Sequence, residues 1–126
     1  MKDITGKWIQ KADEDMKVVE HELKLEEAEC AKGAVCFHAQ QAAEKYLKAF
    51  LADKGKATGK THDIAVLLKL CAEYDAAFDK IEAAELNFYA VQVRYPDDFV
   101  EPAFKEAENC AAKAKEIINL VKNKLK

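Results

Sequence analysis

An arginine and a tyrosine stand immediately before a proline and two aspartates in residues 91–99. Arg94 is the only arginine among the 20 lysines and arginines of the chain. Because a guanidinium is a planar fork of donors, it suits a carboxylate or a phosphate better than a lysine ammonium does. Arg94 and Tyr95 are therefore candidates to hold a phosphate and a neighbouring base. The other interpretation is that Arg94 pairs with Asp97 or Asp98 at a helix end.

A second group of polar residues occupies a stretch that is otherwise rich in alanine. His38, Gln41 and Lys45 are three and four residues apart, so a helix would place them on one strip. Glu44 and Lys48 are four residues apart and can pair along the same helix. The strip has two interpretations: a solvated helix face, or polar groups that line a groove between helices or between subunits.

The cysteines and histidines do not follow a metal-binding pattern. The chain has four cysteines but no C-x-x-C pair, and none of its three histidines belongs to an H-E-x-x-H or E-x-x-H motif. We therefore expect reduced, mostly buried thiols, no metal site and no cofactor. The cysteines concerned are Cys30, Cys36, Cys71 and Cys110.

Length and composition indicate a single folded domain over residues 1–126. About half of the residues are apolar and 34% are charged, with four glycines and two prolines, which is typical of a folded soluble protein. The net charge of −3 argues against strong nonspecific electrostatic binding to nucleic acid. No apolar run is long enough for a bilayer and the start lacks a signal-peptide core, so we expect a cytoplasmic protein that does not enter the membrane.

Apolar residues recur at helical intervals in five segments, and none alternates as in a strand. Glycines at positions 55 and 59 predict a loop after the second segment, and Pro96 should end the fourth. The pattern predicts an all-α, up-and-down bundle. The predicted helices cover residues 3–27, 32–52, 64–74, 79–95 and 102–125.

Three blocks of sequence, in this order and spacing, resemble a known family. They are FHAQQAAEKYLKAFLADKG, KTHDIAVLL and VRYPDDF, and the opening WIQKADEDMKVVEHEL fits the same pattern. Together they resemble the HEPN domain over nearly the whole chain. The resemblance implies four long helices plus a shorter fifth, related to the substrate-binding helical domain of aminoglycoside nucleotidyltransferases. It also implies a homodimer and pairing with a minimal nucleotidyltransferase that supplies catalytic carboxylates.

The chain departs from the catalytic motif of this family. Many HEPN proteins are metal-independent ribonucleases that use R-x4-6-H, in which histidine moves a proton and arginine neutralises the scissile phosphate. The positions that the histidine would take after Arg94 hold Phe99, Val100 and Glu101, and no histidine follows His62. We therefore expect no catalytic residues, and the sequence resembles an RYPDD-type branch with a binding or accessory role.

The resulting expectation is a noncatalytic HEPN subunit, within a toxin–antitoxin-like pair, that binds a nucleotide and/or a minimal nucleotidyltransferase partner. The alternatives are a ribonuclease toxin with a degenerate site, for which RNA would be the substrate, and an oligomeric interaction protein without a small ligand. Broad apolar coverage on the second and fourth helices also predicts a homodimer. The predicted binding residues are Arg94, Tyr95, Asp97, His38, Gln41 and Lys45.

Overall fold

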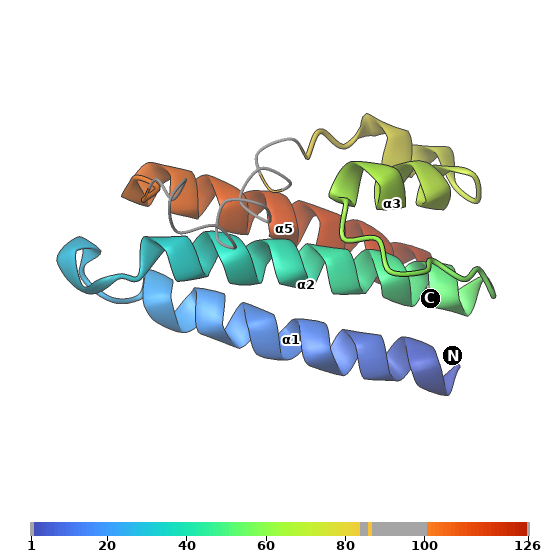
Figure 1. The fold of residues 1–126 in the computed structure, drawn as a ribbon, viewed down its shortest axis with the longest axis horizontal. Coiled ribbons are helices and arrows are strands. Elements are labelled where there is room, and N and C mark those ends of the chain that lie inside the picture. The colour runs from blue at the N-terminus through green and yellow to red at the C-terminus, as the bar shows by residue number, and fades with distance from the viewer. Residues whose placement is uncertain (1, 84–85, 87–100, 126) are drawn as a thin grey trace.

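The computed structural model describes residues 2–83, 86 and 101–125, and these residues form helices, turns and loops without a strand (Figure 1). The all-α prediction is confirmed. Three helices are long and one is short, with two brief 3-10 turns between them. The elements are α1 (Asp3–Leu23), η1 (Glu27–Glu29), α2 (Lys32–Asp53), α3 (Ile64–Ala72), η2 (Ala76–Lys80) and α5 (Phe104–Lys124).

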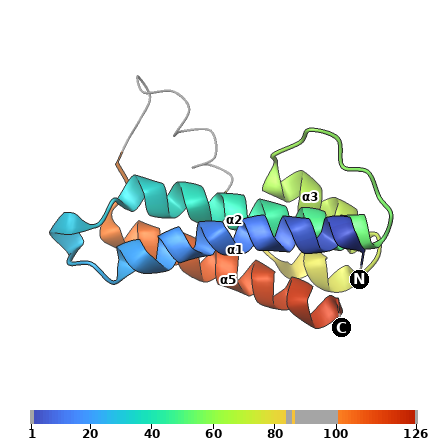
Figure 2. The same cartoon turned by 90° about the horizontal axis from the view of Figure 1, so that it is seen from below.

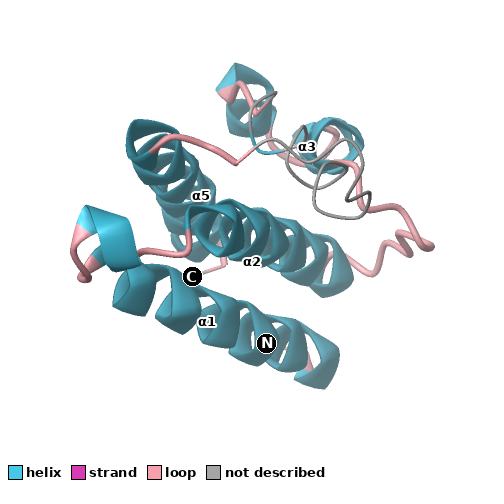
Figure 3. Cartoon of the chain, turned by 60° about the vertical axis from the view of Figure 1, so that its left-hand side comes forward, coloured by secondary structure: helices cyan, strands magenta, loops and turns pink. Residues whose placement is uncertain are grey.

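Helix α2 is the centre of the fold. It packs against α1, α5 and α3, whereas α1 and α5 touch one another little. Figure 1 shows that α1 runs opposite to α2 and α5, and Figure 2 shows the three helices from below. Figure 3 shows α3 on a different side of α2 from α1. Because neighbours surround it, none of the residues of α2 is exposed.

The core follows from the broad apolar face of α2. Its aromatic and aliphatic side chains meet those of the flanking helices, and Phe50 contacts Phe78 of η2 with ring centroids 4.8 Å apart. Burial of such side chains contributes about 1.5–3 kcal/mol each. The largest fully buried apolar side chains are Tyr46, Phe50, Phe78, Leu47, Leu51, Ile64, Leu67, Leu86, Ile117, Val19 and Val35.

The connection from α2 to α3 has the features that its sequence predicts. Gly55 and Gly59 have φ values of +75° and +64°, a conformation that residues with a Cβ rarely adopt. Asp63 then caps α3, since its side chain accepts a hydrogen bond from the backbone N–H of Val66 at 3.2 Å. The loop of residues 54–63 thereby returns the chain to the side of α2.

Two predicted helix boundaries differ from the structure by more than two residues. The helix predicted over 3–27 ends at Leu23, because the carboxylate of Glu22 accepts a hydrogen bond from the backbone N–H of Ala31 at 2.8 Å and turns the chain back. The helix predicted to follow Asp79 does not start there. Asp75 instead caps the 3-10 turn η2, and Ile81 is extended with φ −92° and ψ 125°.

The rest of the predicted fourth helix falls on residues 84–85 and 87–100, which lie outside the described residues. The described part therefore contains three long helices, and the prediction of a fourth long helix remains open. The apolar face of α2 that supported a homodimer is buried within one protomer. The fourth-helix part of that apolar coverage lies outside the described residues, so the homodimer stays a prediction. No helix in the described part of the chain is long and apolar enough to cross a membrane.

The central position of α2 makes a simple prediction about stability. Replacing the fully buried Leu47 with alanine should lower the free energy of unfolding by about 2–5 kcal/mol, because it leaves a cavity between helices. Leu25→Ala is the matched control, since this leucine is 45% exposed and its loss should cost less than about 0.5 kcal/mol. Urea denaturation followed by circular dichroism measures both. Equal effects at the two leucines would contradict the packing described for α2.

Candidate functional site

One side of α2 carries polar residues instead of apolar ones, although none of the residues of the helix is exposed. At 100° per residue, the positions from 38 to 48 that hold polar side chains fill nearly half of the helix circumference. Buried polar groups are costly unless they are paired, so each must find a partner. The partners come from α1, from α2 itself and from the end of the α2–α3 loop. The polar residues of α2 concerned are His38, Gln40, Gln41, Glu44, Lys45 and Lys48.

The first part of this network is centred on Asp15 of α1. One carboxylate oxygen accepts from Lys45 Nζ at 2.7 Å, and the other lies 2.8 Å from His38 Nδ1. The Asp15 side chain is 11% exposed, whereas those of His38 and Lys45 are 30% and 21% exposed. The carboxylate is thus shielded, and the two groups that it holds remain accessible to a ligand.

The second part is centred on Glu44, whose side chain is 3% exposed. Its Oε2 atom lies 3.0 Å from Lys48 Nζ and 2.9 Å from His62 Nδ1, and its Oε1 accepts from Gln40 Nε2 at 3.1 Å. The ammonium of Lys48 also lies 5.4 Å from the centroid of the Trp8 ring, a cation–π contact.

Ionised Glu44 is favoured by these partners. Burial works to raise its pKa, but the hydrogen bonds from His62, Lys48 and Gln40 outweigh burial and hold the pKa of Glu44 below its usual value. The pairing of Glu44 with Lys48 that their spacing predicts is confirmed. It is a buried ion pair, however, and not a surface one.

Two amide side chains extend the second part. Gln41 Nε2 donates to Gln40 Oε1 at 2.8 Å, and Gln40 Nε2 also donates to the carbonyl oxygen of His62 at 3.3 Å. Of the three predicted residues on α2, His38 and Lys45 therefore belong to the Asp15 part, and Gln41 belongs to the Glu44 part. The two parts lie along the same side of α2.

Both imidazoles in the network have the same arrangement. Nδ1 of each faces a carboxylate, that of Asp15 for His38 and that of Glu44 for His62. A proton on Nδ1 satisfies each carboxylate and leaves Nε2 as the nitrogen for a ligand. The His62 side chain is 50% exposed, so its ring is open to solvent at the edge of the site.

The sequence model of the HEPN domain family matches residues 5–124. The chain belongs to the HEPN domain family. Comparison with curated proteins and with solved structures gave no match. The family match covers nearly all of α1 and the whole of α2, α3 and α5, so the polar network lies inside the HEPN domain.

The described part of this HEPN domain contains half of the predicted site. His38, Gln41 and Lys45 are brought together on α2. Arg94, Tyr95 and Asp97 lie outside the described residues, so their placement is not part of this geometry.

Sequence reasoning missed the partners that hold the predicted residues in place. Asp15 and Gln40 had no assigned role, His62 was not linked to the strip on α2, and Glu44 was considered only as a partner of Lys48 along the helix. Asp15 lies 23 residues from His38, and only the packing of α1 on α2 brings them into contact.

The cysteine thiols take no part in this network. All four cysteines are buried and form no disulfide, and burial raises the pKa of the Cys71 thiol to about 12. Within residues 2–83, 86 and 101–125, no group of three or more His, Cys, Asp or Glu side chains could hold a metal ion.

The lowered pKa of Glu44 predicts how acid acts on the fold. Glu44→Gln should lower the free energy of unfolding by about 3 kcal/mol at pH 7, because it leaves the ammonium of Lys48 buried without its counter-charge. A carboxyl group with a lowered folded pKa stabilises the fold above its unfolded value and loses that contribution as pH falls. The difference between wild type and Glu44→Gln should therefore shrink below about pH 4.5.

Urea denaturation at a series of pH values measures this difference. Glu108→Gln is the control because Glu108 is exposed on α5, and this change should alter stability by less than about 0.5 kcal/mol at pH 7. A gap between wild type and Glu44→Gln that stays constant from pH 7 to pH 3 would contradict the ionised state assigned to Glu44.

Proposed function

We propose that this HEPN domain is a noncatalytic subunit that binds a nucleotide, and/or a minimal nucleotidyltransferase partner, along the polar side of α2. The observation that supports it most is the pair formed by His38 and Lys45. Both are held by one shielded carboxylate, that of Asp15, and both remain partly exposed. A phosphate group is the ligand that such paired, oriented donors suit.

The donors left over by the network support a phosphate as the ligand. The Lys45 ammonium has three N–H donors, and one of them donates a hydrogen bond to Asp15. In His38 the bond to Asp15 uses Nδ1, so Nε2 is available, and a protonated imidazole donates there. Because Asp15 already orders the imidazole of His38 and the ammonium of Lys45, phosphate binding would lose less side-chain conformational entropy.

The proposed site also includes the three residues that the family resemblance adds. Arg94 would supply a bidentate contact to phosphate, Tyr95 a ring for a base, and Asp97 a polar contact beside them. The absence of a histidine at positions 99–101 supports an accessory role. In a toxin–antitoxin-like pair, the catalytic carboxylates would come from the nucleotidyltransferase partner.

Calorimetric titration with a nucleoside triphosphate tests the binding proposal. Lys45→Gln should weaken binding about tenfold, because it removes an ammonium that contacts the phosphate. Lys113→Gln is the matched control, since Lys113 also forms a 2.9 Å ion pair, with Glu116, at a similar exposure of 29%. Arg94→Lys should weaken binding by about 1–2 kcal/mol, because lysine keeps the charge but loses the fork.

The melting temperature of each variant separates binding from folding. Lys45→Gln and Arg94→Lys should bind more weakly while most of the protein stays folded at the titration temperature. Equal affinities for wild type, Lys45→Gln and Arg94→Lys would overturn the site. A wild type that binds neither nucleotide nor nucleotidyltransferase would favour an interaction protein without a small ligand.

One observation favours ribonuclease activity as a second candidate. His38 and His62 each have Nδ1 on a carboxylate, the arrangement that orients an imidazole for proton transfer at Nε2. Two such histidines on one polar surface could exchange protons with an RNA 2′-hydroxyl and a leaving oxygen. The missing R-x4-6-H histidine would then be replaced from other elements.

An RNA cleavage assay decides between these two functions. The noncatalytic proposal predicts no cleavage by the purified protein, because the family position of the general base holds no histidine. Cleavage that is abolished by His38→Ala and His62→Ala, and retained by His21→Ala at an exposed position of α1, would establish the second candidate instead.

A further inference from the structure

The single tryptophan of the chain lies outside the apolar core. Trp8 of α1 is partly exposed. Among the described residues, it belongs neither to the buried core cluster nor to the apolar side chains packed against that cluster. Because a tryptophan offers a large apolar surface to a core, its place at the edge of the domain is not explained by core packing.

One face of the Trp8 ring is closed by the polar network. The ammonium of Lys48 lies 5.4 Å from the ring centroid, and the Lys48 side chain, paired with Glu44, is only 6% exposed. The exposed part of Trp8 therefore lies away from Lys48. An aromatic ring with a cation behind it and solvent in front is a platform on which a planar group can stack.

Trp8 lies on the same side of α1 as Asp15. The two residues are seven positions apart, so at 100° per residue they lie within about 20° of each other around the helix and about 10.5 Å apart along it. Asp15 holds the two donors of the proposed phosphate site, His38 and Lys45. The ring and these donors therefore belong to one surface, along which they are separated by about two helical turns.

A cation lies between the ring and the donors. Lys11 is three residues after Trp8 and four before Asp15, which places it on the same side of α1. Lys11 is exposed and forms no hydrogen bond or ion pair with another residue in the part of the chain that the structure describes. An anion that extends from the ring toward Lys45 would pass this ammonium.

A nucleoside triphosphate carries groups that suit this surface, in the same order. Its planar base is at one end and its phosphates are at the other, whereas inorganic phosphate would reach only the donors held by Asp15. Stacking of a base on an aromatic side chain adds affinity for every base, since every base has a π face. A two-ring purine covers more of an indole than a one-ring pyrimidine does, so stacking favours the purine.

We propose that Trp8 is the residue on which the base of the bound nucleotide stacks, and that the site therefore prefers purine nucleotides. The phosphates run from the base along Lys11 to Lys45 and His38. This inference rests on the proposed function and adds a base contact and a preferred class of base to it. Trp8 gives the base a ring in addition to the one that the proposed function assigns to Tyr95.

Tryptophan fluorescence tests the stacking directly, because Trp8 is the source of all of it. ATP should quench the emission as it saturates the protein, because its adenine stacks on the indole. Inorganic tripolyphosphate has no base, so it should displace ATP and restore the emission of the free protein. ATP that binds without any change in the emission would contradict the stacking.

Calorimetric titration separates the base contact from the phosphate contact. Trp8→Leu should weaken ATP binding about tenfold and leave tripolyphosphate binding unchanged, whereas Trp8→Phe keeps a smaller ring and should weaken ATP binding less. Wild type should bind ATP about threefold more tightly than UTP, and Trp8→Leu should bind the two equally. Tyr74→Leu is the matched control, since Tyr74 is a 46% exposed aromatic residue just after α3, and it should bind ATP as wild type does.

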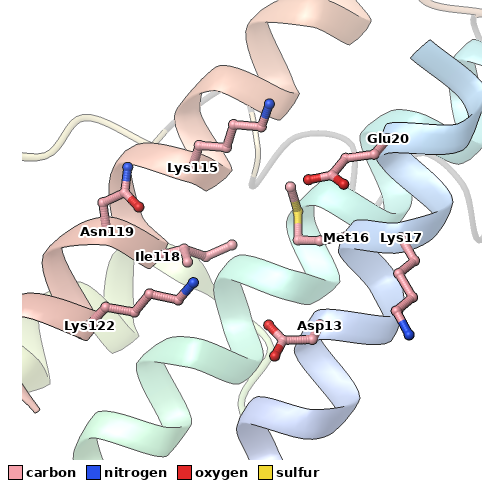
Figure 4. A pocket seen from close by; sticks show the side chains of 8 residues that line it. All are labelled: Asp13, Met16, Lys17, Glu20, Lys115, Ile118, Asn119 and Lys122. Carbon is pink, nitrogen blue, oxygen red and sulfur yellow. The ribbon is translucent and has the colours of Figure 1, made fainter. Parts of the chain in front are cut away.

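Lys11→Gln tests the path of the phosphates. It should weaken the binding of ATP and of tripolyphosphate about threefold each, because it removes one ammonium from an exposed position. Lys17→Gln is the matched control on the same helix and should leave both affinities unchanged. Lys17 lies about 160° around α1 from Asp15 and lines a groove between α1 and α5 (Figure 4).

The outcomes distinguish this inference from the proposed function. Equal ATP affinities for wild type and Trp8→Leu, where Lys45→Gln still binds ATP more weakly, would overturn the inference alone. An equal loss of ATP and tripolyphosphate affinity in Trp8→Leu would also overturn it, since Trp8 would then act by supporting Lys48. Unchanged affinities in Lys11→Gln would overturn the phosphate path. A wild type that binds neither ATP nor UTP would overturn nucleotide binding itself, and this inference with it.

Trp8→Phe keeps the test decisive where Trp8→Leu does not fold, which its melting temperature shows. The ratio of ATP to UTP affinity should then be smaller in Trp8→Phe than in wild type, because less ring is left for the purine to cover. An unchanged ratio in that variant would overturn the inference.

Discussion

The buried carboxylate of Glu44 is the constraint on which the packing around the polar side of α2 depends. An ionised group with 3% exposure is tolerated only when donors reach both of its oxygens. α2 supplies Gln40 and Lys48, but the remaining donor is His62, at the end of the α2–α3 loop. Satisfying Glu44 therefore fixes where this loop returns to α2. Asp63 caps α3 one residue later, so the start of α3 follows from the same contact.

The helices could be predicted from the sequence where their own apolar residues recur at helical intervals. The start of α2 is predicted correctly and its end to within one residue, because its apolar face persists from one end to the other. The end of α1 could not be predicted, because the sequence after Leu23 consists of good helix formers without a glycine or proline. That boundary depends on Glu22, whose side chain binds the backbone of Ala31 nine residues away. A hydrogen bond of this kind forms only in the folded chain, and no periodic pattern in the sequence predicts it.

The candidate site also has a part that the sequence predicts and a part that depends on tertiary packing. Helical spacing is sufficient to place His38, Gln41 and Lys45 on one strip. It does not reveal Asp15, because the register of α1 against α2 decides which carboxylate meets that strip. Nor does spacing distinguish a surface pair from a buried one. The pair of Glu44 with Lys48 has the same sequence pattern in either case, and the difference comes from the loop and from α1, which cover it.

The charge balance of the network limits how it can bind an anion. Its two carboxylates are matched by Lys45 and Lys48, so with neutral imidazoles the described network carries no net charge. Lys48 is already committed to buried Glu44 and to the Trp8 ring, which leaves Lys45 to approach a phosphate. A tightly held phosphate would then need further positive charge, either from protonated His38 or from a cation beyond the network. In the proposed function that cation is Arg94, whose fork of donors suits a phosphate.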